Sequence, residues 1–151
     1  MSIDALSDYP VIHYQSVAWG DMDAFGHVNN VLYYRYIESA RIAYFDRLKV
    51  FQQGILSVVA SSQCHYLKPV FYPDVLRVAA RVDEMRNSAI RMHYLLFSEQ
   101  QNEIVAKAEA VIVFVDNVQM KKTLIPEDIR NSIISLESSV DHILNRAINI
   151  K

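Results

Sequence analysis

One short segment of the chain, WGDMDAFGHVNNVLYYRY, gathers side chains that can do acid–base and nucleophilic chemistry. Asp23 lies between a second aspartate and a histidine, and Asn29 and Asn30 follow directly. A carboxylate can act as a general base or as a nucleophile. The aromatic run after the asparagines is typical of a helix, whose N-terminus carries unpaired N–H groups and a partial positive charge.

A helix end of this kind can polarise a carbonyl oxygen or stabilise an oxyanion. With Asp23 beside it, the segment has the components for acyl transfer or hydrolysis. Simpler roles are open for the same residues: Asp23 can cap a turn, His27 can be a hydrogen-bonded loop histidine, and Asn29 or Asn30 can cap the helix. For Asp21 we expect a structural role, in which it accepts hydrogen bonds from backbone N–H groups of the loop.

The helix that must position these groups is expected over residues 31–49. Apolar side chains recur there at three- and four-residue steps, at Tyr33, Ile37, Ala40, Tyr44 and Leu48. Further apolar residues widen this face, namely Val31, Leu32, Tyr36, Ala43 and Phe45. We therefore predict a helix that is buried on most sides. Its tyrosines are expected in the core, with a place along an acyl tunnel as the alternative. Glu38 is expected at the helix surface or in an ion pair, with a role as a second carboxylate as the alternative.

Most of the remaining chain favours β-structure. Strands are predicted over residues 10–19, 55–69, 75–85, 89–99 and 104–116, separated by short turns. Gly54 is expected to end the first helix or the turn after it. Pro126 and the acids after it begin a second helix over residues 126–137, and the tail is expected to continue as helix. Consecutive hairpins imply an antiparallel sheet, so we predict an α+β fold in which a curved sheet of five or six strands wraps around one long helix.

Composition bounds the class of protein. The 151 residues are expected to form one domain over residues 1–151, with a core of about 10–137 and a tail of about 138–151. The net charge of −2, without a strong basic block, argues against nucleic acid as a partner. No apolar run reaches membrane-spanning length, and no signal peptide is visible. The single cysteine, Cys64, fits a reducing cytoplasm.

Other chemistries find little support. The five histidines lack metal-ligand spacing, so no metal is predicted, and no cofactor is expected. No G-x-S-x-G elbow occurs, which argues against an α/β-hydrolase mechanism. Cys64 has no adjacent set of Cys and His residues for nucleophilic work, and we expect a small buried side chain.

Two motifs resemble a known family. The segments GDMDAFGHVNNVLYYRYIESAR and YLKPVFYPDVLRV are similar to those of hotdog-fold thioesterases of the 4-hydroxybenzoyl-CoA thioesterase type. The resemblance runs from about Tyr14 to about Glu137. The first motif, D-x-D-x-x-G-H-V-N-N opening an aromatic helix, is fairly specific, whereas the second, Y-x-x-P-V-x-x-x-D, is weaker alone. The resemblance implies the hotdog fold and hydrolysis of acyl-CoA thioesters.

The resemblance also assigns roles to residues. Asp23 would be the catalytic carboxylate, which activates water or attacks the thioester to give a mixed anhydride. The amide of Asn30 would bind the thioester oxygen, and His27 stands where some thioester hydrolases of the superfamily keep a functional histidine. Asn29 and Tyr33 become candidate substrate contacts. Coenzyme A, as part of the substrate, would be contacted by basic and polar side chains, with Lys68, Arg86, Asn87, Ser88 and Arg91 as candidates.

Members of the family assemble as dimers and often as tetramers, with the acyl site between two subunits, so a homo-oligomer is expected. The sequence departs from the benzoyl-CoA type, which often has a bulky aromatic residue and a tyrosine at the positions of Asn29 and Asn30. It is nearer the HVNN variety, which is more often linked to fatty acyl thioesters. It also lacks two features of the plant acyl-carrier-protein thioesterases, an asparagine at the position of Phe25 and a glutamate near Pro69.

Two alternatives stay open beside acyl-CoA hydrolysis. A hotdog hydratase or dehydratase would act on enoyl or 3-hydroxyacyl thioesters, usually with a histidine and an acid, and Asp23 and His27 occur together here. A module that binds acyl thioesters without turnover is the second alternative, although such a module has no need of Asp23. The sequence does not distinguish coenzyme A from acyl carrier protein as the carrier, and it does not reveal the acyl chain.

Overall fold

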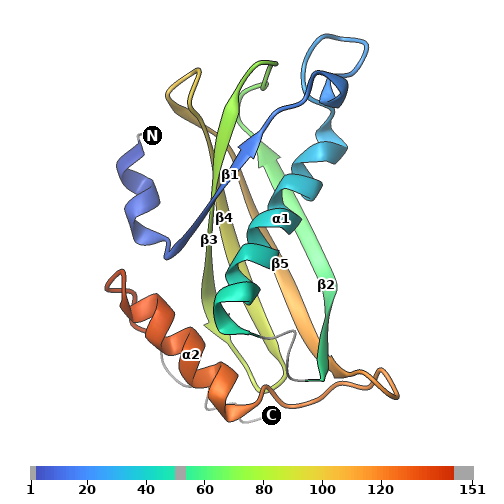
Figure 1. Cartoon of the computed structure of the whole chain (residues 1–151), viewed down its shortest axis with the longest axis vertical. Coiled ribbons are helices and arrows are strands. Elements are labelled where there is room, and N and C mark those ends of the chain that lie inside the picture. Colours follow the sequence, from blue (N-terminus) through green and yellow to red (C-terminus); the bar gives the residue numbers. More distant parts are fainter. Residues whose placement is uncertain (1–2, 50–53, 145–151) are drawn as a thin grey trace.

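The computed structural model describes residues 3–49 and 54–144, and shows a helix lying across one face of a β-sheet (Figure 1). The elements follow in the order η1 (Ile3–Asp8), β1 (Val11–Ser16), η2 (Trp19–Asp21), α1 (Asn30–Leu48), β2 (Ile55–Tyr66), β3 (Val75–Met85), β4 (Ala89–Ser98), β5 (Glu103–Asp116) and α2 (Glu127–Ser138). No helix among these residues is long and apolar enough to cross a membrane.

The sheet has five strands in the spatial order β1-β3-β4-β5-β2, and the neighbouring strands all pair antiparallel. This confirms the predicted α+β architecture, with five strands among the described residues. The hairpins β3–β4 and β4–β5 follow the chain order, whereas β2 lies at the far edge because it pairs with β5. In β2 the register shifts between Val59 and Ser61.

The alternation in β5 shows why the sheet takes α1 on one face only. Ala106, Ala108, Ala110, Ile112 and Phe114 are buried in the main core together with α1. The residues between them include Lys107 and Glu109, which are half-buried on the opposite face. Because the inward residues of the first half of β5 are alanines, little side-chain volume stands between that part of the strand and the helix.

Helix α1 begins with a side-chain cap and ends without glycine. The Asn29 side chain accepts a hydrogen bond from the Val31 N–H (3.0 Å), as predicted for an asparagine cap. At the other end Lys49 takes the left-handed conformation, with φ 57°. Gly54, with φ 70°, lies in the turn before β2.

One face of α1 carries the predicted core. Its buried residues are Tyr33, Tyr36, Ile37, Ala40, Tyr44, Phe45 and Leu48. The prediction that the helix is buried on most sides is wrong for this chain, because Val31, Tyr34 and Ile42 are 69%, 40% and 49% exposed. These three residues form an apolar stripe on the outer side of the helix.

The opposite face of the sheet is partly covered by an element that the sequence pattern did not predict. Leu6 of η1 and Tyr9 pack against Ala79, Leu95 and Phe97 in a second, smaller core. Both faces of the sheet are therefore covered where η1 packs against it. This explains why every residue from Tyr94 to Ser98 is buried.

The second predicted helix is present as α2, but the tail does not extend it. After Ser138 the chain continues as turn and coil as far as Leu144, so the predicted helical continuation is wrong for residues 139–144. The rest of that prediction, residues 145–151, lies outside the described residues.

Candidate functional site

The loop that carries Asp23 is closed on itself by short backbone hydrogen bonds. The Asp23 N–H donates to the carbonyl of His27 (2.9 Å), and the Gly26 N–H donates to the carbonyl of Asp23 (3.1 Å). Gly26 has φ 87°, a conformation that glycine adopts without strain. The Val28 N–H then donates to the carbonyl of Val70 (2.8 Å), which docks the loop on the chain between β2 and β3.

Asp23 lies in this loop as a partly accessible carboxylate. One oxygen accepts a hydrogen bond from the Phe25 N–H (2.9 Å). The other lies 3.8 Å from Nδ1 of His27, and the two side chains are 23% and 37% exposed. The carboxylate is thus oriented by the loop and still open to a ligand or water.

The first turn of α1 leaves the amide of Asn30 available. The Asn29 side chain takes the Val31 N–H, and the Leu32 N–H donates to the Asn29 carbonyl (2.9 Å). Within the described part of the chain, no acceptor is found for the Asn30 N–H. This amide lies at the end of the helix where the dipole favours negative charge.

A cavity of about 180 Å³ opens at this helix end. Its lining residues, which define the helix-end cavity, are His27, Val28, Asn30, Tyr33, Tyr66, Leu67, Lys68 and Pro69. Four of the predicted site residues, His27, Asn30, Tyr33 and Lys68, are therefore brought together. Asp23 is next to the cavity through its contact with His27, and Asn29 serves as the helix cap.

Tyr66 is a cavity residue that sequence reasoning did not single out. Its hydroxyl donates to the carbonyl of Asn30 (3.2 Å), and its ring meets Tyr33 edge-on at 4.8 Å. Burial raises the pKa of Tyr33 to about 12. Burial also raises the pKa of the nearby Cys64 thiol to about 11, so the thiol stays protonated at neutral pH. Tyr66 opens the Y-x-x-P motif, which was the available signal.

A larger groove runs along the outer side of α1. This α1–β2 groove has a volume of about 350 Å³ and is lined by Val31, Tyr34, Arg35, Ile37, Glu38, Arg41, Val59 and Ser62. Tyr34 and Ser62 belong to the same two elements as Tyr33 and Tyr66 of the helix-end cavity. Glu38 is exposed, and no ion pair within 4 Å joins it to another described residue. The Arg41 guanidinium reaches inward and donates to the Tyr94 hydroxyl (3.1 Å).

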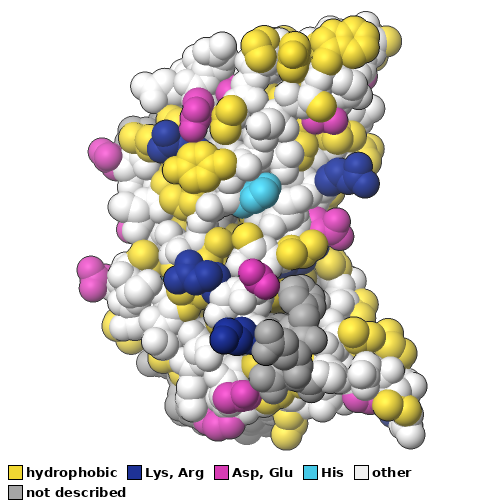
Figure 2. Space-filling view, viewed as in Figure 1, with side chains coloured by type: hydrophobic (Ala, Val, Ile, Leu, Met, Phe, Trp, Pro, Cys, Tyr) yellow, Lys and Arg dark blue, Asp and Glu magenta, His cyan; other side chains and the backbone are white. Residues whose placement is uncertain are grey.

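Exposed aromatic side chains surround the loop. Phe25 and Phe71 are 84% and 48% exposed, and each ring centroid lies 6.5 Å from that of His27. Figure 2 shows hydrophobic side chains gathered at the end of the molecule that holds this loop. The mouth of the site is therefore more apolar than an ordinary surface loop.

The remaining predicted coenzyme A contacts lie elsewhere. Arg86, Asn87 and Ser88 form the β3–β4 turn, at the end of the sheet opposite the loop. Ten residues of β4 separate the two ends, which corresponds to about 30 Å. Arg86 is paired with Glu84 (2.9 Å), and Lys68, although it lines the cavity, is paired with Glu103 (2.5 Å).

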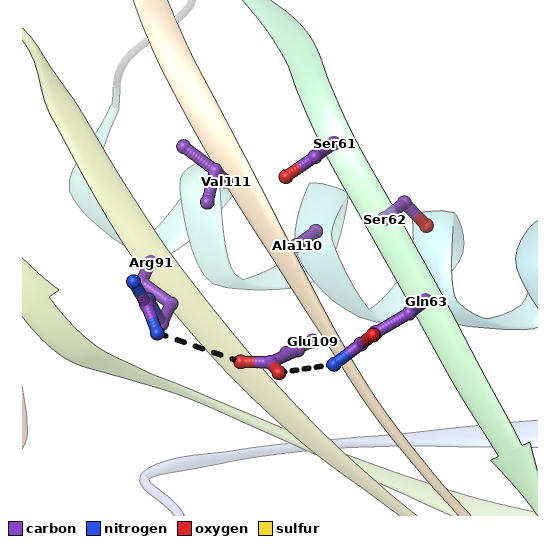
Figure 3. A pocket seen from close by; sticks show the side chains of 7 residues that line it. All are labelled: Ser61, Ser62, Gln63, Arg91, Glu109, Ala110 and Val111. Atoms are coloured by element: carbon purple, nitrogen blue, oxygen red, sulfur yellow. Dashed lines mark hydrogen bonds and ion pairs between the residues drawn. The ribbon is translucent and has the colours of Figure 1, made fainter.

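Arg91 lines a third cavity, of about 230 Å³, shown in Figure 3. This cavity includes Ser61, Gln63 and Glu109, which share the sheet face turned away from α1. Gln63 and Arg91 both reach Glu109 there, the first through a hydrogen bond and the second through an ion pair of 3.9 Å. The charges in this cavity are therefore largely balanced within the chain. Among the described residues, no three His, Cys, Asp or Glu side chains are grouped to hold a metal ion.

Comparison with known proteins identifies the family. A family model described as the Thioesterase-like superfamily matches residues 17–133, and the chain belongs to this superfamily. The five-stranded sheet with α1 on one face is the hotdog fold of its thioesterases, as the resemblance implied.

Three individual proteins illustrate this similarity. The chain is 38% identical to the uncharacterized protein YsmA of Bacillus subtilis over 82 residues, which cover 53% of this chain and 56% of YsmA. It is 22% identical to the long-chain acyl-CoA thioesterase FadM of Escherichia coli, over 74% of this chain and 88% of FadM. A thioesterase from Thermus thermophilus, solved in complex with coenzyme A and Zn, superposes with a TM-score of 0.78 and 34% identity, over 87% of this chain and 97% of that one.

Proposed function

We propose that the protein is an acyl-CoA thioester hydrolase that converts an acyl-CoA and water to a carboxylic acid and free coenzyme A. The observation that carries the proposal is the placement of a free helix N-terminal amide, on Asn30, in a cavity that His27 also lines, with the Asp23 carboxylate 3.8 Å from the His27 ring. The names of the relatives support the substrate class, because FadM is an acyl-CoA thioesterase and the Thermus protein binds coenzyme A.

The proposed reaction uses two groups of this site, the Asn30 amide and the Asp23 carboxylate. The thioester carbonyl oxygen accepts a hydrogen bond from the Asn30 N–H, and the positive end of the helix dipole stabilises the negative charge that develops on that oxygen. Asp23 either removes a proton from the attacking water or attacks the carbonyl carbon itself. In the first route the C–S bond breaks, the acid forms directly, and the leaving thiolate of coenzyme A takes up the proton that Asp23 removed from water. In the second route loss of the thiolate leaves a mixed anhydride on Asp23, and water then hydrolyses this anhydride to release the acid, restore the carboxylate and supply the proton of the thiol. His27 stands close enough to Asp23 to orient its carboxylate.

The α1–β2 groove is the proposed place of the acyl chain. Its walls include Ile37, Val59 and Tyr34, and its position on the same two elements as the helix-end cavity lets one chain extend from the first into the second. Tyr33 lines the helix-end cavity, and Tyr34 lines the groove next to it. The coenzyme A portion would leave past Lys68, whose pairing with Glu103 is exposed and easily exchanged.

A second copy of the chain is the proposed partner. Strand β2 is twelve residues long and lies at the edge of the sheet, with its outer backbone groups unpaired within the described residues. Leu56, Val58 and Val59 are 43%, 42% and 45% exposed on it. An exposed, apolar edge of this length favours pairing with another strand, and a copy paired there would also cover the apolar stripe of α1, of which Val31 and Tyr34 line the groove. In this dimer, Arg86 and the rest of its turn can approach the site of the other subunit.

The test is release of free thiol from a panel of short, long and aromatic acyl-CoAs, measured on wild type and Asp23→Asn in parallel. We expect turnover that falls by a hundredfold or more in the variant. Asp46→Asn, an exposed aspartate near the far end of α1, is the control and is expected to keep wild-type turnover. Binding of acyl-CoA without turnover in wild type would instead support the binding module. Equal turnover in wild type and Asp23→Asn would refute the role of Asp23.

One observation favours a second candidate function, that of a hydratase. Nδ1 of His27 lies 3.8 Å from the Asp23 carboxylate, and hotdog hydratases usually use a histidine together with an acid. The same enzyme preparation therefore receives an enoyl-CoA, and loss of the conjugated double bond is followed by absorbance. Hydration of the enoyl-CoA without thiol release would replace hydrolysis by this reaction.

A further inference from the structure

We propose that Asp21 and Tyr36 form a positioning pair that fixes the Asp23 loop on α1 and thereby sets the rate of the reaction. This inference rests on the proposed function, because it concerns the placement of Asp23. It assigns a task to the first aspartate of the D-x-D motif, which takes no direct part in the proposed chemistry.

The pair is a short, charge-assisted hydrogen bond. The Tyr36 hydroxyl donates to Oδ2 of Asp21 at 2.6 Å, and Tyr36 is only 1% exposed. Burial and the Asp21 carboxylate both raise the pKa of Tyr36, so its hydroxyl keeps its proton throughout the physiological range. Hydrogen bonds with an ionised partner are roughly twice as strong as neutral ones.

Asp21 connects this buried anchor to both ends of the loop. The same Oδ2 accepts the Ala18 N–H (3.0 Å), where the chain enters the loop. The carbonyl of Asp21 accepts the Asn29 N–H (3.0 Å), where the loop passes into the helix cap. The Asp23–Val28 turn is thus held between two ends that are both tied to one residue, and that residue is tied to the second turn of α1.

The consequence for the site is geometric. Asp23 must face a thioester carbonyl that is bound at the Asn30 amide, and these two groups belong to the loop and to the helix respectively. Asp21 and Tyr36 join the same two parts. A displacement of about 1 Å between reacting groups can lower a rate by about a hundredfold, so removal of the Tyr36 hydroxyl is expected to lower kcat more than it raises KM.

The chain offers a matched control on the same helix. Tyr44 lies two helical turns beyond Tyr36 and donates to the carboxylate of Glu137 at 2.5 Å, and it is also fully buried. Its partner belongs to α2, at the end of the helix away from the loop. Tyr36→Phe and Tyr44→Phe therefore each remove one hydroxyl that donates to a carboxylate, and only the first of these bonds holds the loop.

The experiment compares kcat and KM for thioester hydrolysis, together with the melting temperature, in wild type, Tyr36→Phe, Tyr44→Phe, Asp21→Asn and Asp21→Ala. For Tyr36→Phe we expect kcat to fall by about ten- to a hundredfold with KM changed less than about threefold. For Tyr44→Phe we expect a lower melting temperature at wild-type kcat. Asp21→Asn, which keeps an acceptor oxygen, should retain more activity than Asp21→Ala. Wild-type kcat in Tyr36→Phe, or equal losses of kcat in both tyrosine variants, would overturn the inference.

A second measurement does not depend on turnover. Amide hydrogen exchange over residues 18–29 should become faster in Tyr36→Phe and stay unchanged in Tyr44→Phe, and unchanged exchange in both would also refute the pair. The two proposals fail separately. An inactive wild type or a fully active Asp23→Asn defeats the proposed function, whereas an Asp23-dependent enzyme with normal kcat in Tyr36→Phe defeats the positioning pair alone.

Discussion

Tyr44 of α1 donates a hydrogen bond of 2.5 Å to Glu137 of α2, and both side chains are shut off from solvent. The same carboxylate accepts the Val82 N–H of β3 (2.8 Å) and lies 2.7 Å from Nδ1 of His142. One buried acid therefore joins the long helix, the sheet, the second helix and the segment that follows it.

Removal of this acid should be strongly destabilising. In Glu137→Ala the hydroxyl of Tyr44 and the amide of Val82 lose their acceptor while still buried, and breaking a buried charged network of this kind costs about 3–5 kcal/mol. Urea unfolding followed by circular dichroism measures the loss. Glu38→Ala, at an exposed position of α1, should stay within about 0.5 kcal/mol of wild type. Similar stability in the two variants would contradict the structural role of Glu137.

The groove along α1 predicts a change in chain-length preference. Ser62 lines the α1–β2 groove, and a phenylalanine there should obstruct it, so Ser62→Phe is expected to lower kcat/KM for long acyl-CoAs by tenfold or more while short ones are still hydrolysed. Ser61 precedes it and does not line the groove. Ser61→Phe is therefore the matched control, and an equal effect of both substitutions on long chains would place the acyl group elsewhere.

The exposed edge strand predicts self-association through β2. A charge on such an edge discourages pairing, so Val58→Lys should raise the dissociation constant of the dimer by tenfold or more in sedimentation velocity. Val118→Lys puts the same charge on a valine that is 84% exposed in a turn, and it should leave the dimer intact. A wild-type protein that stays monomeric at high concentration would refute the proposed partner.

The single cysteine gives a pH-dependent prediction. Burial raises the pKa of the Cys64 thiol from an ordinary value of 9.0 to about 11, and the thiolate is the reactive form. Alkylation of the folded protein at pH 8 should therefore be about a hundredfold slower than that of a free thiol, and should rise about tenfold per pH unit toward pH 11. In urea the rate should return to the ordinary value. Rapid alkylation of the folded protein at pH 8 would show that Cys64 is activated.

Local periodicity predicted most of the fold. The alternation around Ala108 and the three- and four-residue steps through Tyr44 indicated a strand and a helix, and both exist because burial on one face imposes that spacing. Asn29 was recognisable as a cap because its side-chain chemistry suits a helix start. The exposure of Val31 and Ile42 was not predictable, because the type of an apolar residue does not show whether its side chain faces the core or the outer side of the helix.

The candidate site was only partly accessible to sequence reasoning. His27 and Asn30 share a cavity because they are close along the chain, so their proximity followed from the motif. Tyr66 reaches the same cavity from a distant strand, and Tyr36 meets Asp21 across fifteen residues. Contacts of this kind depend on how elements pack, which no local pattern encodes.

The short helix at the start of the chain has a consequence for how the protein is handled. The family model begins at residue 17, yet Leu6 and Tyr9 close the sheet face over Leu95 and Phe97. A fragment trimmed to the family boundary would leave that apolar face open to water and to other molecules. The part of the chain that packs together is therefore longer than the part that the family model matches. An expression clone should keep the first residues if the purified protein is to stay in solution.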